Sequence, residues 1–164
     1  MDIVIRPARP EEYEEAGRIT VEAFVGDGYT ASDSDYVHRL RDAARRAAEA
    51  ELLVAVDSAA GAVLGCVTFA VGGTTWADIA TPEEGEIRML ATAAAARGRG
   101  VGEALVRAAL ARSRELGLAG MAFSTQQEMR AAHRIYERVG FERAPERDWS
   151  PVPGIDLMVY RMAF

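Results

Sequence analysis

The chain has 164 residues, a length typical of one domain with its own core, so we expect a single domain across residues 1–164. Its net charge of −6 argues against nucleic acid as the main partner, because phosphate backbones attract basic surfaces. The sequence shows neither an apolar run of membrane-span length nor a signal-peptide pattern. With Cys66 as the single cysteine, an internal disulfide is excluded, and we expect a cytoplasmic protein without a membrane partner.

The first half of the chain predicts two helices between strands. A strand at Ile3–Ile5 precedes an amphipathic helix over Glu11–Phe24, a loop, and a second helix that Ser32 or Asp33 caps and that runs to about Glu49. A hairpin follows, with strands at Leu52–Val56 and Val63–Val71. Next comes a polar loop at Gly72–Gly85, where Trp76 either forms a wall of a ligand pocket or packs back on its own domain.

The second half predicts strands that alternate with helices. In chain order, we expect a strand at Glu86–Thr92, a helix at Glu103–Leu116, a strand at Met121–Thr125, a helix at Met129–Val139, a strand at Phe141–Arg143, a loop at Glu146–Gly154 and a strand at Ile155–Met162. Gly140 suits the left-handed residue that ends a helix. Tyr136 falls on the apolar face of its helix and is expected to point inward.

A glycine-rich turn stands between the strand at Glu86–Thr92 and the next helix. Gly98, Gly100 and Gly102 allow positive φ and close backbone approach, and a run of N–H groups at a helix N-terminus attracts an anion such as a pyrophosphate. A Walker A loop needs a lysine, and the chain has none. A dinucleotide fingerprint needs glycine where Glu103 stands, so that interpretation is also poor.

The turn instead resembles the acetyl-CoA motif (Gln/Arg)-x-x-Gly-x-(Gly/Ala) of the GNAT superfamily of N-acetyltransferases, here Arg97-Gly98-Arg99-Gly100-Val101-Gly102. A second block, Ala132–Phe141, resembles the family pattern A-x-x-(L/I)-Y-x-x-x-G-F. The resemblance implies an α/β fold of the α+β kind: a twisted, mixed, mostly antiparallel sheet of about seven strands. Four helices cover both faces of that sheet, and its fourth and fifth strands splay apart.

The resemblance also implies site residues and an activity. It implies acetyl-CoA as co-substrate, without a metal, and direct transfer of the acetyl group to a primary amine. Tyr136 is expected to protonate the CoA sulfur, unless it is a packed core tyrosine. Glu86 stands at the position of a general base in some members, or is an exposed carboxylate at a strand start. The residues expected to hold the cofactor are Leu90, Ala91, Thr92, Arg97, Gly98, Arg99, Gly100, Val101, Gly102, Glu103 and Tyr136.

The sequence leaves two classes of acceptor, a small-molecule amine, which we favour, and a protein amine. The resemblance assigns acceptor contacts to the loops at Val25–Thr30, Gly72–Gly85 and Glu146–Gly154, and the candidate contacts are Phe24, Tyr29, Trp76 and Asp78. A non-catalytic CoA-binding sensor is the rival function, and a homodimer is kept open. Met129 stands where the family often has a cofactor-binding asparagine, so Gln126 or Gln127 is a candidate substitute.

Overall fold

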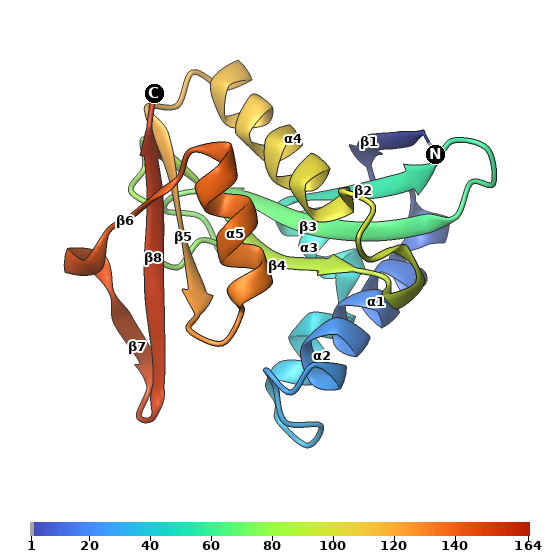
Figure 1. Ribbon diagram of the computed structural model, residues 1–164, viewed down its shortest axis with the longest axis horizontal. Helices are drawn as coiled ribbons and strands as arrows, with labels where there is room; N and C mark the ends of the chain where they lie inside the picture. Colours follow the sequence, from blue (N-terminus) through green and yellow to red (C-terminus); the bar gives the residue numbers. More distant parts are fainter. Residues whose placement is uncertain (1) are drawn as a thin grey trace.

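The computed structural model describes residues 2–164 and contains a mixed sheet with helices on both faces (Figure 1). Its strands are β1 (Ile3–Pro7), β2 (Glu51–Asp57), β3 (Val63–Val71), β4 (Glu84–Thr92), β5 (Gly120–Gln126), β6 (Glu142–Arg143), β7 (Trp149–Val152) and β8 (Ile155–Ala163). Its α-helices are α1 (Tyr13–Gly26), α2 (Tyr36–Arg41), α3 (Ala43–Glu49), α4 (Val101–Glu115) and α5 (Arg130–Val139). Short 3-10 turns lie at Pro10–Glu12, Ala94–Ala96 and Pro145–Arg147. The predicted fold class is confirmed.

The strands follow the order β1-β2-β3-β4-β5-β8-β6, and β7 pairs with β8. Neighbouring strands run antiparallel except β4 and β5, which are parallel. That parallel ladder has two register pairs, Glu84 with Gly120 and Gly85 with Met121. Beyond these pairs the two strands separate, as predicted, and Figure 1 shows β4 and β5 running in different directions.

A bulge in β4 changes which way its side chains point. The register against β3 shifts between Cys66 and Thr68, and Met89 has a φ of 55°, an uncommon value for a residue other than glycine. Met89 packs in the core under α2, whereas Leu90 packs beside α4 and α5. The bulge therefore turns the side chain of Leu90 toward the gap between β4 and β5.

Alternate residues of the central strands pack into separate hydrophobic cores on the two faces of the sheet. On β2, Leu53 and Ala55 pack with residues of α4 and α5, whereas Leu52 and Val54 pack with residues of α1 and α3. The larger core also contains Phe123 of β5, so it spans both sides of the gap.

The predicted second helix is wrong in one respect, because the structure divides it into α2 and α3. Asp42 leaves the helical region with a φ of −82° and a ψ of 67°, and its side chain accepts a hydrogen bond from the amide of Arg45. The guanidinium of Arg46 is fully buried and donates to the carbonyl oxygens of Arg39 and Leu40, which end α2. These contacts satisfy the carbonyl oxygens that a continuous helix would have used.

The loop predicted at Glu146–Gly154 is also wrong in part, because it contains β7. Trp149 and Val152 pair with β8, and Gly154 forms the hairpin turn with a φ of 87°. The sequence did not predict this strand because it contains Pro151 and is followed by Pro153. In the structure β7 lies off the main strand order and pairs with β8, and proline is tolerated in such an edge strand.

Candidate active site

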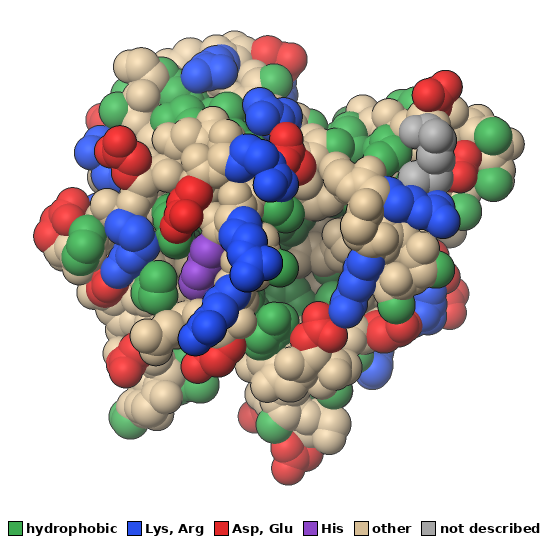
Figure 2. All heavy atoms as spheres, viewed as in Figure 1, with side chains coloured by type: hydrophobic (Ala, Val, Ile, Leu, Met, Phe, Trp, Pro, Cys, Tyr) green, Lys and Arg blue, Asp and Glu red, His purple; other side chains and the backbone are tan. Residues whose placement is uncertain are grey.

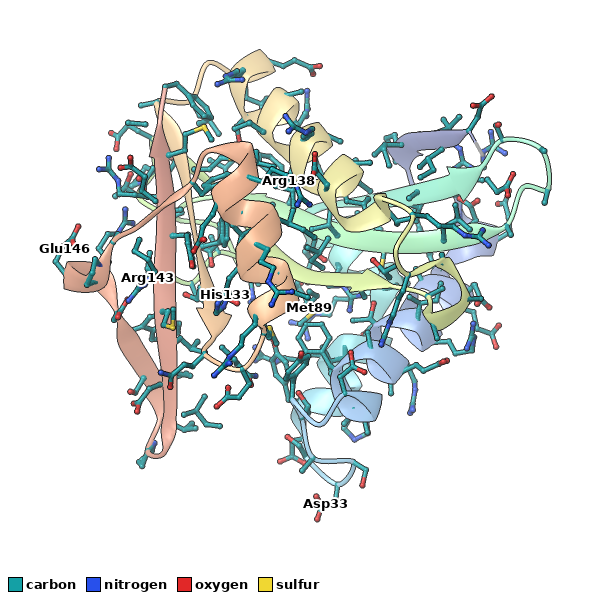
Figure 3. All side chains as sticks on the ribbon, in the orientation of Figure 1. Asp33, Met89, His133, Arg138, Arg143 and Glu146 are labelled. Atoms are coloured by element: carbon teal, nitrogen blue, oxygen red, sulfur yellow. The ribbon has the colours of Figure 1, made fainter. Side chains whose placement is uncertain are left out.

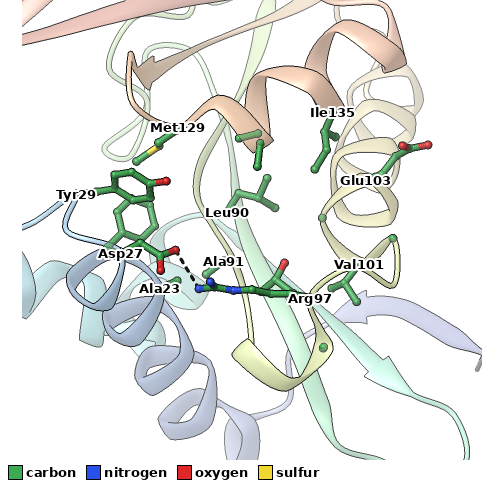
Figure 4. Close-up of a pocket in the computed structure, with 18 of the residues that line it drawn as sticks. Ala23, Asp27, Tyr29, Leu90, Ala91, Arg97, Val101, Glu103, Met129 and Ile135 are labelled. Atoms are coloured by element: carbon green, nitrogen blue, oxygen red, sulfur yellow. Dashed lines mark hydrogen bonds and ion pairs between the residues drawn. The ribbon is translucent and has the colours of Figure 1, made fainter.

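A cavity of about 470 Å³ lies between the end of β4, the glycine turn and the start of α5, beside the gap between β4 and β5. Figure 2 shows this hollow near the centre of the view, with apolar side chains at its base and charged side chains on its rim. Figure 4 shows its walls, which come from the end of α1, the end of β4, the glycine turn and α5. Residues that line it include Phe24, Tyr29, Leu90, Ala91, Thr92, Arg97, Gly98, Gly100, Val101, Gly102, Glu103, Met129 and Ile135.

The glycine turn has the conformation that the sequence predicted, and its backbone is open to the cavity. Gly98 and Gly100 have φ values of 78° and 79°, and no atom lies within 4 Å of where a Cβ would stand on either. The amide of Ala104 donates to the carbonyl oxygen of Gly100 at 3.0 Å, which is the first bond of α4. The amides of Val101, Gly102 and Glu103 therefore have no acceptor within the helix, and such unpaired amides at a helix N-terminus suit an anion.

Glu103 places a carboxylate at this anion site, but two arginines neutralise it. Arg138 of α5 donates to its Oε1 at 2.6 Å, and Arg107 donates to its Oε2 at 3.1 Å. The hydrogen bond from Arg138, then that from Arg107, lowers the pKa of Glu103 below its ordinary value. The Glu103 charge is thereby balanced, and the helix N-terminus remains suited to an anion.

Arg97 is half-exposed and reaches across the cavity. Its Nη2 lies 2.9 Å from Oδ2 of Asp27, which follows the last residue of α1 (Figure 4). From the other side of the gap, Gln126 at the end of β5 donates to the carbonyl oxygen of Tyr29 at 3.3 Å. The loop that follows α1 thus contacts both sides of the gap, Arg97 after β4 and Gln126 at the end of β5.

Tyr136 points inward from α5, as predicted, and is 5% exposed. Its ring packs against Phe123 with centroids 4.5 Å apart and lies 5.6 Å from that of Tyr160. Its hydroxyl makes no hydrogen bond with any residue from 2 to 164, whereas that of Tyr160 donates to Glu137 at 2.9 Å. Burial, with a smaller effect of Tyr160, raises the pKa of Tyr136, so the hydroxyl keeps its proton at neutral pH.

Glu86 is not the exposed carboxylate that one interpretation predicted, because it is 1% exposed. Its Oε1 accepts hydrogen bonds of 2.9–3.0 Å from the amides of Asp78, Ile79 and Ala80. Burial raises the pKa of Glu86, although these three bonds oppose the shift. Glu86 does not line the cavity and stands about 13 Å along the strand from Leu90. The structure thus supports Glu86 as the anchor of the loop before β4.

The four candidate acceptor residues divide into two groups. Phe24 and Tyr29 line the cavity, with ring centroids 6.5 Å apart. Trp76 is buried and donates from its indole nitrogen to Glu49 at 3.0 Å, so the packing interpretation describes its position. Asp78 forms an ion pair with Arg88 at 3.4 Å, away from the residues that line the cavity.

Sequence reasoning missed the wall that α5 contributes. Met129, just before α5, and Ala132 and Ile135 of α5 line the cavity at a spacing of three residues. Met129, at the expected asparagine position, presents a thioether whose Sδ accepts from Thr125 at 3.7 Å. Gln126 donates to Tyr29 and Gln127 is exposed, and neither is among the residues that line the cavity.

The cavity fits an acyl-CoA. The open cradle around Gly98 and Gly100 and the unpaired amides of α4 suit a diphosphate, and the separated edges of β4 and β5 offer main-chain groups to a pantetheine arm. Among residues 2–164, no group of three or more histidine, cysteine, aspartate or glutamate side chains is placed to hold a metal ion.

Residues 13–141 match the sequence profile of the Acetyltransferase (GNAT) family. The chain belongs to this family. Among solved structures, a GNAT family acetyltransferase from Staphylococcus aureus Mu50 gives a TM-score of 0.76 at 14% identity, covering 99% of both chains. A Brucella melitensis GNAT acetyltransferase in complex with acetyl-CoA gives 0.68 at 25% identity, covering 99% of this chain and 88% of that chain. A putative acetyltransferase from Salmonella typhimurium with its cofactor acetyl-CoA gives 0.71 at 20% identity, covering 99% and 94%.

This GNAT protein is an acyltransferase, and GNAT enzymes use acetyl-CoA as co-substrate. Comparison with curated proteins gave no significant match. Every helix in the described part of the chain is too short or too polar to span a bilayer.

The glycine cradle makes a direct prediction for Gly100→Val in this GNAT domain. Valine at a φ of 79° is strained, and its side chain would project from the turn that faces the diphosphate. We expect the rise in melting temperature on adding acetyl-CoA to be lost, whereas at about 100 Kd of ligand a binding protein gains about 2.7 kcal/mol.

Gly61→Val is the matched control. Gly61 has a φ of 73°, has open space around it, and lies in the turn between β2 and β3, away from the cavity. It should lose similar stability but keep the ligand-induced rise. An undiminished rise in Gly100→Val would remove this turn from the site.

Proposed function

We propose that this protein transfers the acetyl group of acetyl-CoA directly to a primary amine of a small molecule. The observation that carries the proposal is the cavity that joins the glycine cradle to the gap between β4 and β5. Bound acetyl-CoA would supply an activated thioester there. Residues of this chain would bind the donor, hold a proton and contact the amine.

Two segments would hold the donor. The amides of Val101, Gly102 and Glu103, with Gly98, Gly100 and Arg97, line the cavity and are assigned to the diphosphate. Arg99 of the same turn is not among the lining residues, and it is assigned to the diphosphate from the sequence motif alone. The main chain of Leu90, Ala91 and Thr92 is assigned to the pantetheine and to the carbonyl oxygen of the thioester. Backbone donors on a rigid strand are pre-organised for a developing negative charge.

Tyr136 is proposed as the general acid that protonates the departing CoA sulfur. Its hydroxyl has no partner among the described residues, and its raised pKa keeps the proton in place until a thiolate needs it. Tyr136 is not itself among the residues that line the cavity, but Ala132 and Ile135, which neighbour it on α5, are. A general-base role for Glu86 receives no support from its position, so we propose that solvent accepts the ammonium proton.

The acceptor is proposed to be compact. The loop after α1 lies across the gap, tied to Arg97 on one side and to Gln126 on the other. Phe24 and Tyr29 narrow the same side of the cavity. A small amine needs less room at such a site than an extended polypeptide does.

The test is thiol release from acetyl-CoA with a panel of polyamines, amino acids, aminoglycosides and peptides that carry a free N-terminal or lysine amine. We expect turnover with one class of small amines and background rates with the peptides. Turnover confined to peptides would replace the small-molecule acceptor with a protein. CoA binding without turnover on any amine would favour a non-catalytic sensor.

A further inference from the structure

One ion pair joins the two ends of the cavity that the proposed function assigns to different substrates. Arg97 belongs to the turn assigned to the donor, and Asp27 belongs to the loop assigned to the acceptor. They are 70 residues apart in the sequence, and both line the cavity. Arg97 Nη2 lies 2.9 Å from Asp27 Oδ2, and Figure 4 shows the pair bridging the mouth of the cavity.

A diphosphate bound at the glycine turn would compete for this pair. Arg97 is half-exposed and Asp27 one-third exposed, so their attraction is that of a surface ion pair, which water and salt weaken. A diphosphate carries more charge than one carboxylate, and amides from the start of α4 also bind it. Asp27 would then face a bound anion of like charge in the same cavity.

The loop after α1 is held to the end of that helix by backbone hydrogen bonds, such as those from the amides of Tyr29 and Thr30 to the carbonyl oxygen of Phe24, and the Asp27–Arg97 pair ties it to the glycine turn. The hydrogen bond from Gln126 to the carbonyl oxygen of Tyr29, at 3.3 Å, ties it to the end of β5. Loss of the Arg97 contact would free the side of the loop that carries Asp27. Phe24 and Tyr29 flank this side and line the proposed acceptor region.

From these contacts, and on the basis of the proposed function, we infer that Asp27 is a positioning residue that couples donor binding to the acceptor loop. Its carboxylate holds Arg97 until the diphosphate of the donor takes Arg97 over, and the loop is then released. Asp27 therefore weakens donor binding, and the acceptor loop becomes mobile only after the donor is bound.

The test measures CoA affinity by calorimetry in the full chain. Asp27→Asn keeps the shape and removes the charge, and we expect it to bind CoA about two- to fivefold more tightly at low salt, the range of exposed ion pairs. Arg97→Gln should weaken binding, and adding Asp27→Asn to it should bring no gain. Pantetheine, which lacks the diphosphate, should show no gain with Asp27→Asn.

Asp33→Asn is the matched control for net charge. Asp33 is exposed on the segment between α1 and α2, and Figure 3 shows it at the tip that points away from the cavity. Its CoA affinity should equal that of the wild type. A second measurement is amide exchange of residues 24–30, which should become faster when CoA is added to the wild type and be fast without CoA in Asp27→Asn.

Equal CoA affinities for Asp27→Asn and Asp33→Asn would overturn the inference. So would a gain that persists with pantetheine, or exchange in residues 24–30 that CoA does not accelerate. Failure of the wild type to bind CoA is a different result, because it removes the proposed donor itself.

Discussion

Replacing Glu86 by alanine is expected to lower the free energy of unfolding by about 3–5 kcal/mol. The amides of Asp78, Ile79 and Ala80 would lose their shared acceptor, Oε1 of Glu86, in a buried position. These hydrogen bonds are partly buried; a buried donor left unpaired costs about 1–3 kcal/mol, and the three costs overlap because they arise in one turn. Chemical denaturation measures the loss.

Glu86→Gln is the matched control, because its amide oxygen accepts the same three bonds. Burial raises the pKa of Glu86, so its contribution to stability is complete below the unfolded pKa and is lost as pH rises through the folded pKa. Glutamine does not ionise, and the difference in unfolding free energy should therefore shift in favour of Glu86→Gln as pH rises above the unfolded pKa of a glutamate, about 4.3. A stable Glu86→Ala protein would contradict the anchor role.

The variant Glu86→Gln also distinguishes a structural anchor role of Glu86 from a general-base role. As an anchor, Glu86→Gln should keep the wild-type dependence of kcat/KM on pH. A general base would show itself by a moved or flattened acidic limb in Glu86→Gln.

Tyr136→Phe is expected to lower kcat by about 10–10³-fold, in the range of acid–base contributions, with little change in donor affinity. The substitution keeps the ring that packs on Phe123 and deletes one hydroxyl, which makes no hydrogen bond within residues 2–164. Stability should therefore change little, and the loss should be specific to turnover. Steady-state kinetics on the best amine, with acetyl-CoA saturating, measures it.

Tyr160→Phe is the matched control in the same aromatic cluster. Its hydroxyl donates to Glu137 at 2.9 Å, so its removal should cost stability rather than kcat. Equal turnover by Tyr136→Phe and the wild type would remove Tyr136 from the mechanism.

Local patterns predicted the parts of the fold that depend on neighbours in sequence. Gly140 ends α5 with a φ of 116°, and Tyr136 lies on the buried face, because both follow from helix periodicity and glycine conformation. The glycine turn was predictable for the same reason, since Gly98 and Gly100 adopt positive φ. The order of the main elements followed from these signals and from the family resemblance.

The features that sequence reasoning missed depend on contacts between distant segments. Met89 takes a positive φ with no glycine to signal it, because the bulge is set by pairing with β3. The burial of Glu86 depends on the loop folding back over it. The wall that Ala132 and Ile135 contribute and the Asp27–Arg97 pair likewise exist only once α1, β4 and α5 have assembled.

The two-pair ladder between β4 and β5 has a consequence for aggregation. Strands that separate inside a sheet expose two additional edges, each with main-chain groups that would pair with another extended chain. The outer edges at β1 and β6 are short, whereas the inner edge of β4 is long. The loop after α1 shields part of that inner edge. Loss of soluble protein on storage should therefore be fastest when the cavity is empty, and a bound CoA should slow it by covering both inner edges.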